Sequence, residues 1–427
     1  MQILSNVVRY IISLPPAVFI GIVMGVLCLV FGGGIKNALR SACLFSVGMT
    51  GINLIMSYCV GEMQSIATAL STRLGIELSM IDGGYGAGGS GGSWMFPGAI
   101  PALCIMLVIN IVFILLKWTD TMWTDVHNTW HGIYIGLLIY ALTGSVLYGT
   151  IVAIITLVIM LKLGDLTAPT FQEFNGTPNI AVYATSATIP AIFTFFVMKV
   201  INKIPGLKDL KADAESIQDR FGIFGEIMVI GMLLGIILGI LAGYNFKNIM
   251  MTGVVMSATM TLFPKMAALI CEGIVPVTTS VIGFMNKHFS GRKLNVAVDP
   301  AMLLGDPSVM ASFVILVPIS IVMAMVTPGI AFIPIASLAG MPYWIGGVVP
   351  YTKGNVVHTV ICMSLYIFLA SLVATQLGPI VTEAARLTGR MTEAIASGIT
   401  IVSWDEGGSF IGYAFVKLFK LLGLSVL

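Results

Sequence analysis

Residues 227–246 read IMVIGMLLGIILGILAGYNF, without a single Asp, Glu, Lys or Arg. An α-helix needs about 20 predominantly apolar residues to cross the hydrocarbon core of a bilayer. The same property returns in six further charge-free windows: 10–35, 41–61, 98–116, 131–161, 307–352 and 354–382. Strands of a membrane barrel would alternate over segments of about ten residues, and these windows do not alternate. The sequence therefore predicts a polytopic membrane protein of hydrophobic helices.

The overall composition supports this class. Of 427 residues, 57% are apolar and 9% are charged, whereas soluble domains are typically about one-quarter charged. Such a composition excludes an ordinary soluble enzyme and a disordered chain. The net charge of +2 is also too small for the basic footprint of a nucleic-acid-binding protein.

The charge map also predicts topology. Each shorter window should hold one span, while residues 307–352 must hold two passes or a re-entrant turn. Residues 199–220 are the exception, because they carry nine charged side chains, five of them basic. Short loops rich in Lys and Arg lie on the cytoplasmic side of the membrane, so we expect this segment to be a cytoplasmic linker.

The two halves of the chain resemble each other. Gly-Ile-Val-Met-Gly at 21–25 recurs as Gly-Met-Leu-Leu-Gly at 231–235, and Asn-Thr-Trp-His at 128–131 resembles Asn-Val-Val-His at 355–358. Short matches in a preserved order favour a duplication. The predicted organisation is therefore a first repeat at 1–198, the charged linker at 199–221 and a second repeat at 222–427.

The number of spans sets the orientation of these repeats. Five spans are expected before the linker, and an odd number makes the second repeat opposite in orientation to the first. The N-terminus then lies outside the cytoplasm. Inverted repeats with a binding site near the bilayer midplane are a design of secondary transporters. We therefore expect an all-α fold of about ten or eleven transmembrane helices, with re-entrant or discontinuous segments.

Residues 82–94 form a glycine-rich stretch, DGGYGAGGSGGSW. It satisfies the pattern GxGxxG, but no strand is expected before it, so a dinucleotide site is excluded. So many glycines disfavour a helix, and non-helical backbone at membrane depth is tolerated where it lines a cavity. Asp82 and Tyr85 are therefore candidate site residues, with a flexible loop outside the membrane as the alternative.

Two further segments carry acids beside apolar windows. Asp299 and Asp306 are each followed by a proline, which breaks helices, and Asp405 and Glu406 precede Gly-Gly-Ser409. Ionisable residues at membrane depth usually mark a substrate or ion pathway. Because a carboxylate accepts several hydrogen bonds, these acids suit a substrate with many hydroxyl groups.

His127 and His131 are four residues apart and would share a helical face. Neither HExxH nor a third ligand accompanies them, and the six cysteines contain no CxxC pair, so we expect no metal and no cofactor. His131 opens an apolar window, where its imidazole could hydrogen-bond a hydroxylated substrate. A purely structural histidine remains the alternative.

At these residues the chain resembles the galactitol-type membrane subunit, enzyme IIC, of the bacterial phosphoenolpyruvate-dependent sugar phosphotransferase system, in the ascorbate–galactitol superfamily. The resemblance covers nearly the whole chain. It is carried by the following strings: WH at 130–131, AESIQDRFGIFGE at 214–226, GY at 243–244, DPAMLLG at 299–305, KGN at 353–355 and DEGGS at 405–409.

The resemblance implies a homodimeric permease of the bacterial inner membrane. Each protomer would contain a scaffold domain and a core transport domain, both drawn from the two inverted repeats and moving in an elevator-like manner. It implies a polyol or sugar substrate, galactitol or a related hexitol, that is phosphorylated by a phosphocysteine of a separate IIB protein, itself supplied by IIA. The chain itself would be a transport subunit and not an enzyme.

The candidate substrate-binding residues are Asp82, Tyr85, His131, Ser186, Asp299, Asp306, Asp405, Glu406 and Ser409. Two departures from the family pattern bear on the substrate: Asp306 stands where a non-acidic residue is expected, and Tyr183-Ala-Thr-Ser186 stands in place of His-Gly-Thr-Ser. Both would face the bound polyol.

One alternative function is an ion-coupled secondary transporter of a small polar solute, with Asp82, Asp306 and Glu406 as proton or sodium sites. An intramembrane enzyme is the remaining class. It would need a metal or nucleophile motif. HExxH and clustered DDxxD acids are missing, and GxSxG occurs only as GGSGG at 88–92, within the glycine-rich stretch.

Overall fold

Long helices and a few very short strands make up the protein in a computed structural model, which describes residues 14–74, 79–84, 87, 90–210, 226–288, 294–404 and 408–427. The helices before residue 210 are α2 (Pro16–Val30), α3 (Gly34–Leu74), α5 (Ser90–Ser93), α6 (Ala99–Leu115), η1 (His127–Thr129), α7 (Trp130–Thr143), α8 (Val146–Asn175) and α9 (Thr185–Ile201). Those after it are α11 (Ile227–Leu241), α12 (Phe246–His288), η3 (Pro300–Gly305), α13 (Pro307–Val326), η4 (Ala336–Ala339), α14 (Met341–Thr352), α15 (Val356–Leu387), α16 (Thr392–Ala396) and α17 (Phe410–Leu421).

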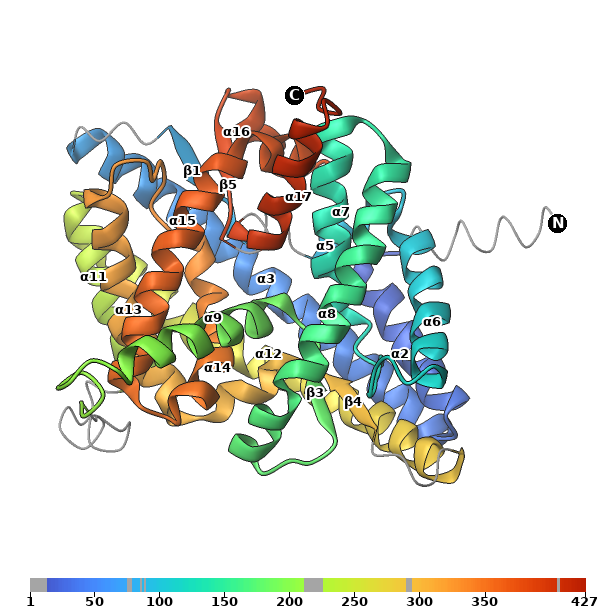
Figure 1. The fold of residues 1–427 in the computed structure, drawn as a ribbon. Coiled ribbons are helices and arrows are strands. Elements are labelled where there is room, and N and C mark those ends of the chain that lie inside the picture. Colours follow the sequence, from blue (N-terminus) through green and yellow to red (C-terminus); the bar gives the residue numbers. More distant parts are fainter. Residues whose placement is uncertain are drawn as a thin grey trace.

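Within the described residues, four helices are long and apolar enough to cross a membrane: Gly34–Ile55, Val146–Asn175, Pro307–Val326 and Val356–Leu387. Several shorter apolar helices accompany them. Figure 1 shows α3 and α12 running through the centre of the molecule, with α13 and α15 on one side and α6, α7 and α8 on the other. The expected membrane class and largely helical fold are thus confirmed.

The recurring Gly-x-x-x-Gly motif has a packing role. In α2, a Cβ at Gly25 would lie 3.1 Å from the carbonyl oxygen of Ala38 in α3. In α11, a Cβ at Gly235 would lie 2.4 Å from the carbonyl oxygen of Thr252 in α12. Small residues let membrane helices approach closely. Each motif therefore packs a short helix directly against the long helix that follows it.

Residues 131–161, expected to hold one span, contain a helix break. Gly144 ends α7 in the left-handed conformation at φ 68°, and the Ser145 hydroxyl accepts a hydrogen bond from the Tyr148 N–H at 3.3 Å as the N-cap of α8. A left-handed glycine followed by a capping serine is a typical end and start of helices. The window therefore holds all but the first residue of α7 and the first part of α8. Residues 307–352 hold α13, the short helix η4 and α14. Of these, α13 is long and apolar enough to cross a membrane.

Five strands among the described residues correct the expectation of an all-α fold: β1 (Met80–Asp82), β2 (Thr121–Met122), β3 (Ile180–Val182), β4 (Asn295–Val298) and β5 (Thr400–Val402). They form two small parallel sheets, β1–β5 and β2–β4–β3. Each sheet joins a segment before residue 210 to one after residue 226. The segments between long helices therefore satisfy their backbone groups with partners far away in the sequence.

The order of elements recurs along the chain. When the short elements α5, β2, η1, η3, η4 and α16 are set aside, the series α2, α3, β1, α6, α7, α8, β3, α9 is followed by α11, α12, β4, α13, α14, α15, β5, α17. The match between 128–131 and 355–358 is out of register with this order. Asn128 precedes α7, whereas Asn355 caps α15, the counterpart of α8.

Candidate functional site

Three helix N-termini meet at a pocket against the sides of α14 and α15. His131 lies at the start of α7, Thr185 and Ser186 at the start of α9, and Ser409 at the N-cap of α17. The pocket is lined by His131, Thr185, Ser186, Ile189, Trp344, Tyr366, Ser409 and Phe410. Its cavity volume is about 20 Å³, and about 300 Å³ is free of atoms when the open space around it is included. Among these described lining residues, none is Asp, Glu, Lys or Arg.

One side of the pocket is polar. The His131 Nε2 atom lies 3.5 Å from the Ser186 hydroxyl oxygen, and the imidazole stacks on Trp130 with ring centroids 3.9 Å apart. The Ser409 hydroxyl accepts a hydrogen bond from the Gly412 N–H. The first N–H groups of a helix have no intrahelical partner and carry a partial positive charge. This side therefore favours ligands with oxygen acceptors.

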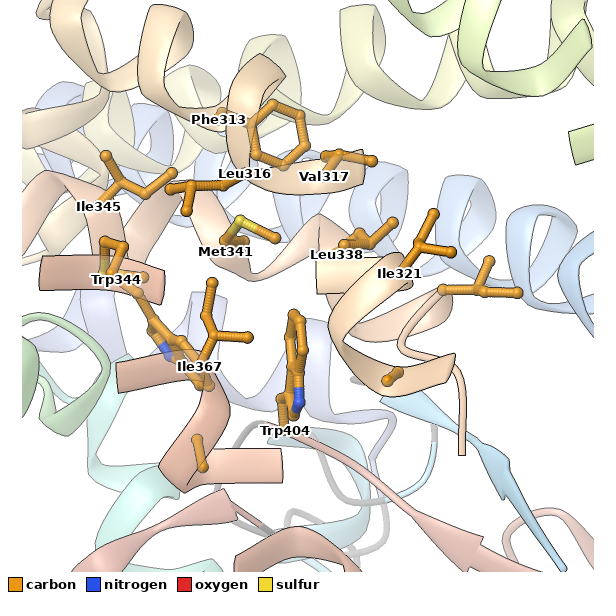
Figure 2. Close-up of a cluster of buried hydrophobic side chains, with 14 of the residues drawn as sticks. Phe313, Leu316, Val317, Ile321, Leu338, Met341, Trp344, Ile345, Ile367 and Trp404 are labelled. Atoms are coloured by element: carbon orange, nitrogen blue, oxygen red, sulfur yellow. The ribbon is translucent and has the colours of Figure 1, made fainter. Parts of the chain in front are cut away.

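The other side is aromatic. The Tyr366 ring contacts Trp344 and Phe410 edge to face, with centroids 5.1 Å and 5.3 Å away. Trp344 lies at a tilt of 33° to Trp404 at 5.7 Å. Figure 2 shows Trp344 and Trp404 against the aliphatic core formed by residues of α13, α14 and α15. The aromatic wall is therefore held rigidly by packing from behind.

A cluster of two buried carboxyl groups lies beside the polar wall. The Asn128 side-chain amide donates to the carboxylates of Asp125 and Asp299, each at 2.7 Å. Asp125 follows β2, Asp299 follows β4 and Ser186 follows β3. Because these strands are parallel, their carboxyl ends meet at one edge, the place where parallel sheets generally bind ligands.

Residues 10–394 match the EIIC-GAT family, described as the PTS system sugar-specific permease component. The chain belongs to this family. It is therefore a transport subunit of the phosphotransferase system, a multi-pass protein of the bacterial inner membrane that works with IIA and IIB components on a sugar.

Curated relatives support the family assignment. The permease is 29% identical over 417 residues to the PTS system galactitol-specific EIIC component of Escherichia coli (strain K12), covering 97% of this chain and 91% of the relative. It is also 29% identical over 412 residues to a putative permease IIC component of the same strain, covering 96% of this chain and 93% of the relative.

Of the nine predicted site residues of the permease, the pocket brings together His131, Ser186 and Ser409. Tyr85, Asp405 and Glu406 lie outside the described residues. Asp299 lies in the neighbouring carboxyl cluster. Within the described part of the chain, no group of three or more His, Cys, Asp or Glu could hold a metal ion.

Asp82 holds backbone in place instead of lining the pocket. Its carboxylate accepts hydrogen bonds from the Gly84 N–H at 2.9 Å and the Ile335 N–H at 2.8 Å. It also accepts bonds from the Ser337 N–H at 2.8 Å and the Ser337 hydroxyl at 2.6 Å. The Ser337 hydroxyl in turn accepts a bond from the Trp404 N–H at 3.0 Å. Asp82 therefore fixes the start of η4 and, through Ser337, the segment that follows β5.

Asp306 has a similarly local role. Its carboxylate accepts a hydrogen bond from the Ser308 N–H at 2.8 Å as the N-cap of α13, and Pro307 occupies the first helical turn. Both are favoured residue types at a helix start. Asp306 is not among the residues that line the pocket.

The sequence did not single out the aromatic wall. Trp344, Tyr366 and Phe410 lie in or beside apolar segments, where an aromatic residue is equally typical of a core or a lipid-facing position. The sequence offered Asn128 only as part of the repeat match at 128–131, and it did not single out Asp125. The contact with Asp299 that gives them a further role spans distant parts of the chain.

Proposed function

We propose that this permease binds and translocates a polyol, galactitol or a related hexitol, and that the pocket at the N-termini of α7, α9 and α17 is its substrate site. The observation that carries this proposal is the pocket lining. Hydroxyl and imidazole groups face an aromatic wall, and no Asp, Glu, Lys or Arg is among the described lining residues. Largely apolar pockets with a few convergent polar groups are typical of small-molecule sites.

A polyol matches both walls. Its hydroxyl groups can donate to and accept from His131, Ser186 and Ser409, since imidazole and hydroxyl groups do both. Its C–H surface can lie against Tyr366 and Trp344, and burial of this apolar surface would favour binding. Asp405 and Glu406 directly precede the segment that carries Ser409, and we retain them, with Tyr85, as candidate substrate contacts.

The architecture is proposed to consist of two inverted repeats, residues 1–198 and 222–427, joined by the linker at 199–221. The recurring order of elements supports this division, as does the pairing of strands from both halves in each sheet. About ten or eleven transmembrane segments would form a scaffold and a core domain drawn from both repeats. A homodimer with elevator-like movement of the core is the proposed mode of transport.

Transport is proposed to be coupled to phosphorylation by a phosphocysteine on IIB, which IIA supplies. The transferred phosphoryl group carries negative charge on its oxygens, and fixed N–H dipoles stabilise such charge. The helix N-termini at the pocket would place these dipoles near the accepting hydroxyl group. The permease would contribute binding and orientation, while the phosphoryl donor lies on the other chain.

The decisive experiment uses membrane vesicles that contain the permease. We expect phosphorylated polyol to accumulate with phosphoenolpyruvate and the soluble components, and nothing to accumulate without them. Accumulation of unmodified substrate with a proton or sodium gradient alone would overturn the proposal in favour of ion-coupled transport.

The pocket itself is tested by calorimetry of purified protein with a panel of polyols. His131→Ala should raise Kd about tenfold, because a lost hydrogen bond to substrate is worth about 1–1.5 kcal/mol. Glu406→Gln should also weaken binding without unfolding the protein. The matched control is Ser397→Ala, an exposed serine whose hydroxyl bonds only its own helix in the described contacts. Wild-type affinity in His131→Ala would remove the pocket as the substrate site.

A further inference from the structure

The aromatic wall of the pocket belongs to a closed ring of contacts that begins and ends on α15. Tyr366 of α15 meets Trp344 of α14 edge to face, with ring centroids 5.1 Å apart, and Trp344 lies 5.7 Å from Trp404 at a tilt of 33°. The indole N–H of Trp404 then donates to the hydroxyl oxygen of Ser371 at 2.8 Å. Ser371 follows Tyr366 in the same helix. Trp344 is therefore enclosed between two rings that are both attached to α15.

Trp404 is held at two points. Its backbone N–H donates to the Ser337 hydroxyl at 3.0 Å, and its indole N–H donates to the Ser371 hydroxyl. Trp404 is 1% exposed and Ser371 is 2% exposed. Figure 2 shows Trp404 in the same buried cluster as Trp344. A buried donor that loses its acceptor has no water to replace it, so the two bonds together fix the place and the rotation of the indole.

The Ser371 hydroxyl selects one orientation of the indole. It accepts from Trp404 and donates to the carbonyl oxygen of Ile367 in its own helix at 2.8 Å. A planar ring attached to a tetrahedral carbon has a broad torsional preference, and packing against aliphatic side chains alone does not direct its N–H. A single buried acceptor does direct it. Ser371 therefore determines which part of Trp404 lies against Trp344.

We infer that Ser371 is a positioning residue for the substrate site. It is not among the described residues that line the pocket. Its hydroxyl orients Trp404, Trp404 supports Trp344 at a tilted ring contact, and Trp344 forms part of the wall. Without the hydroxyl, the buried indole N–H has lost its acceptor, and the indole turns away from its present orientation. The hydrogen bond stands without the proposed function, whereas its effect on polyol affinity rests on it.

The hydrogen bond itself is measured by ultraviolet resonance Raman spectroscopy of the purified permease without substrate, in which indole bands report hydrogen bonding at Nε1. The difference between wild type and Trp404→Phe isolates Trp404 among the six tryptophans. We expect a hydrogen-bonded indole in wild type and a weakly bonded one in Ser371→Ala. The matched control is Ser320→Ala, at a serine that is 1% exposed and whose hydroxyl donates to its own helix in the described contacts. It should leave the spectrum of Trp404 unchanged.

The consequence for the pocket is measured by calorimetry of polyol binding to the folded protein. Ser371→Ala should raise Kd about three- to tenfold, which corresponds to the loss of one aromatic contact, and Ser320→Ala should not. Trp404→Phe keeps a ring but has no N–H. Ser371→Ala should therefore have no further effect on Kd in the Trp404→Phe background, because the hydrogen bond is already absent.

Three results would overturn the inference: the same Trp404 spectrum in wild type and Ser371→Ala, wild-type affinity in Ser371→Ala, or effects that multiply in the double variant. Both single variants remove the same hydrogen bond. If one does not fold, the other is compared with Ser320→Ala, and equal affinities refute the positioning role. If His131→Ala also binds polyol like the wild type, the proposed substrate site fails and the positioning role fails with it. If His131→Ala binds weakly while Ser371→Ala binds like the wild type, only the positioning role fails.

Discussion

Replacement of Asp82 separates the role that the sequence predicts for this residue from the role that the structure gives it. The sequence predicts that Asp82 binds the substrate. In the structure its carboxylate is buried and receives hydrogen bonds from Gly84, Ile335 and Ser337. We therefore expect Asp82→Ala to destabilise the fold first and to affect binding only through the displaced backbone.

The magnitude follows from these contacts. Each hydrogen bond to a charged group is worth about 1.5–3 kcal/mol, but the cost of burying the carboxylate offsets much of their sum. What Asp82→Ala leaves behind is three buried N–H donors and a hydroxyl group without their acceptor. A loss of about 4 kcal/mol is expected, within the range for breaking a buried charged contact. Asp82→Asn keeps one acceptor oxygen and should lose about half as much.

The assay is thermal unfolding of the purified permease in detergent, with polyol affinity measured on the fraction that remains folded. The matched control is Asp209→Ala, which removes an exposed carboxylate and should change neither quantity. An Asp82→Ala protein that unfolds at the wild-type temperature but no longer binds polyol would refute the structural role. It would restore Asp82 as a substrate contact.

Three further changes test the packing, the capping and the aromatic wall. Gly235→Ala should destabilise the permease by about 1–3 kcal/mol in the same unfolding assay, because its Cβ would lie 2.4 Å from a backbone oxygen of α12. The control is Gly283→Ala, which has open space around it and should be neutral or stabilising. Asp306→Ala should lower stability by about 1 kcal/mol through loss of the α13 N-cap, with unchanged polyol affinity by calorimetry. Tyr366→Leu should raise the Kd for polyol about tenfold, whereas Tyr366→Phe should not. Aromatic contacts are worth about 0.5–1.5 kcal/mol each, and Phe keeps the ring. Equal affinities of the two variants would contradict a role for the ring.

The helices could be predicted from the sequence because their signals are local. A charge-free window and its apolar composition are enough to place a helix such as α11. The break at Gly144 and Ser145 also had a local signal, a glycine followed by a capping residue, but the absence of charge across the window concealed it. The motif at 21–25 and its counterpart at 231–235 predicted a repeated unit, and the structure explains it by close helix packing.

The strands could not be predicted in this way. Each is only a few residues long, and its hydrogen bonds go to a segment from the other half of the chain. Only part of the pocket could be predicted from the sequence, because its lining residues come from segments far apart in the chain. His131 opens an apolar window and therefore stood out. Ser409 belongs to the acidic segment 405–409, and Ser186 was a candidate only through the resemblance to the family. Trp344 and Tyr366 did not stand out, because their position at the pocket depends on how α14 and α15 pack.

The acids show why ionisable residues at membrane depth need a second interpretation beside a ligand pathway. Asp165, within the span Val146–Asn175, accepts hydrogen bonds from the hydroxyl groups of Thr119 and Thr121 and from the Asp120 N–H, and so holds the start of β2. Asp82 and Asp306 do the same for η4 and α13. Buried non-helical backbone carries N–H groups that water does not reach, and leaving one unpaired costs about 1–3 kcal/mol. A carboxylate satisfies several of them at once, so a permease with broken helices needs acids for its own framework, and an acid in such a segment is not by itself evidence of a substrate contact.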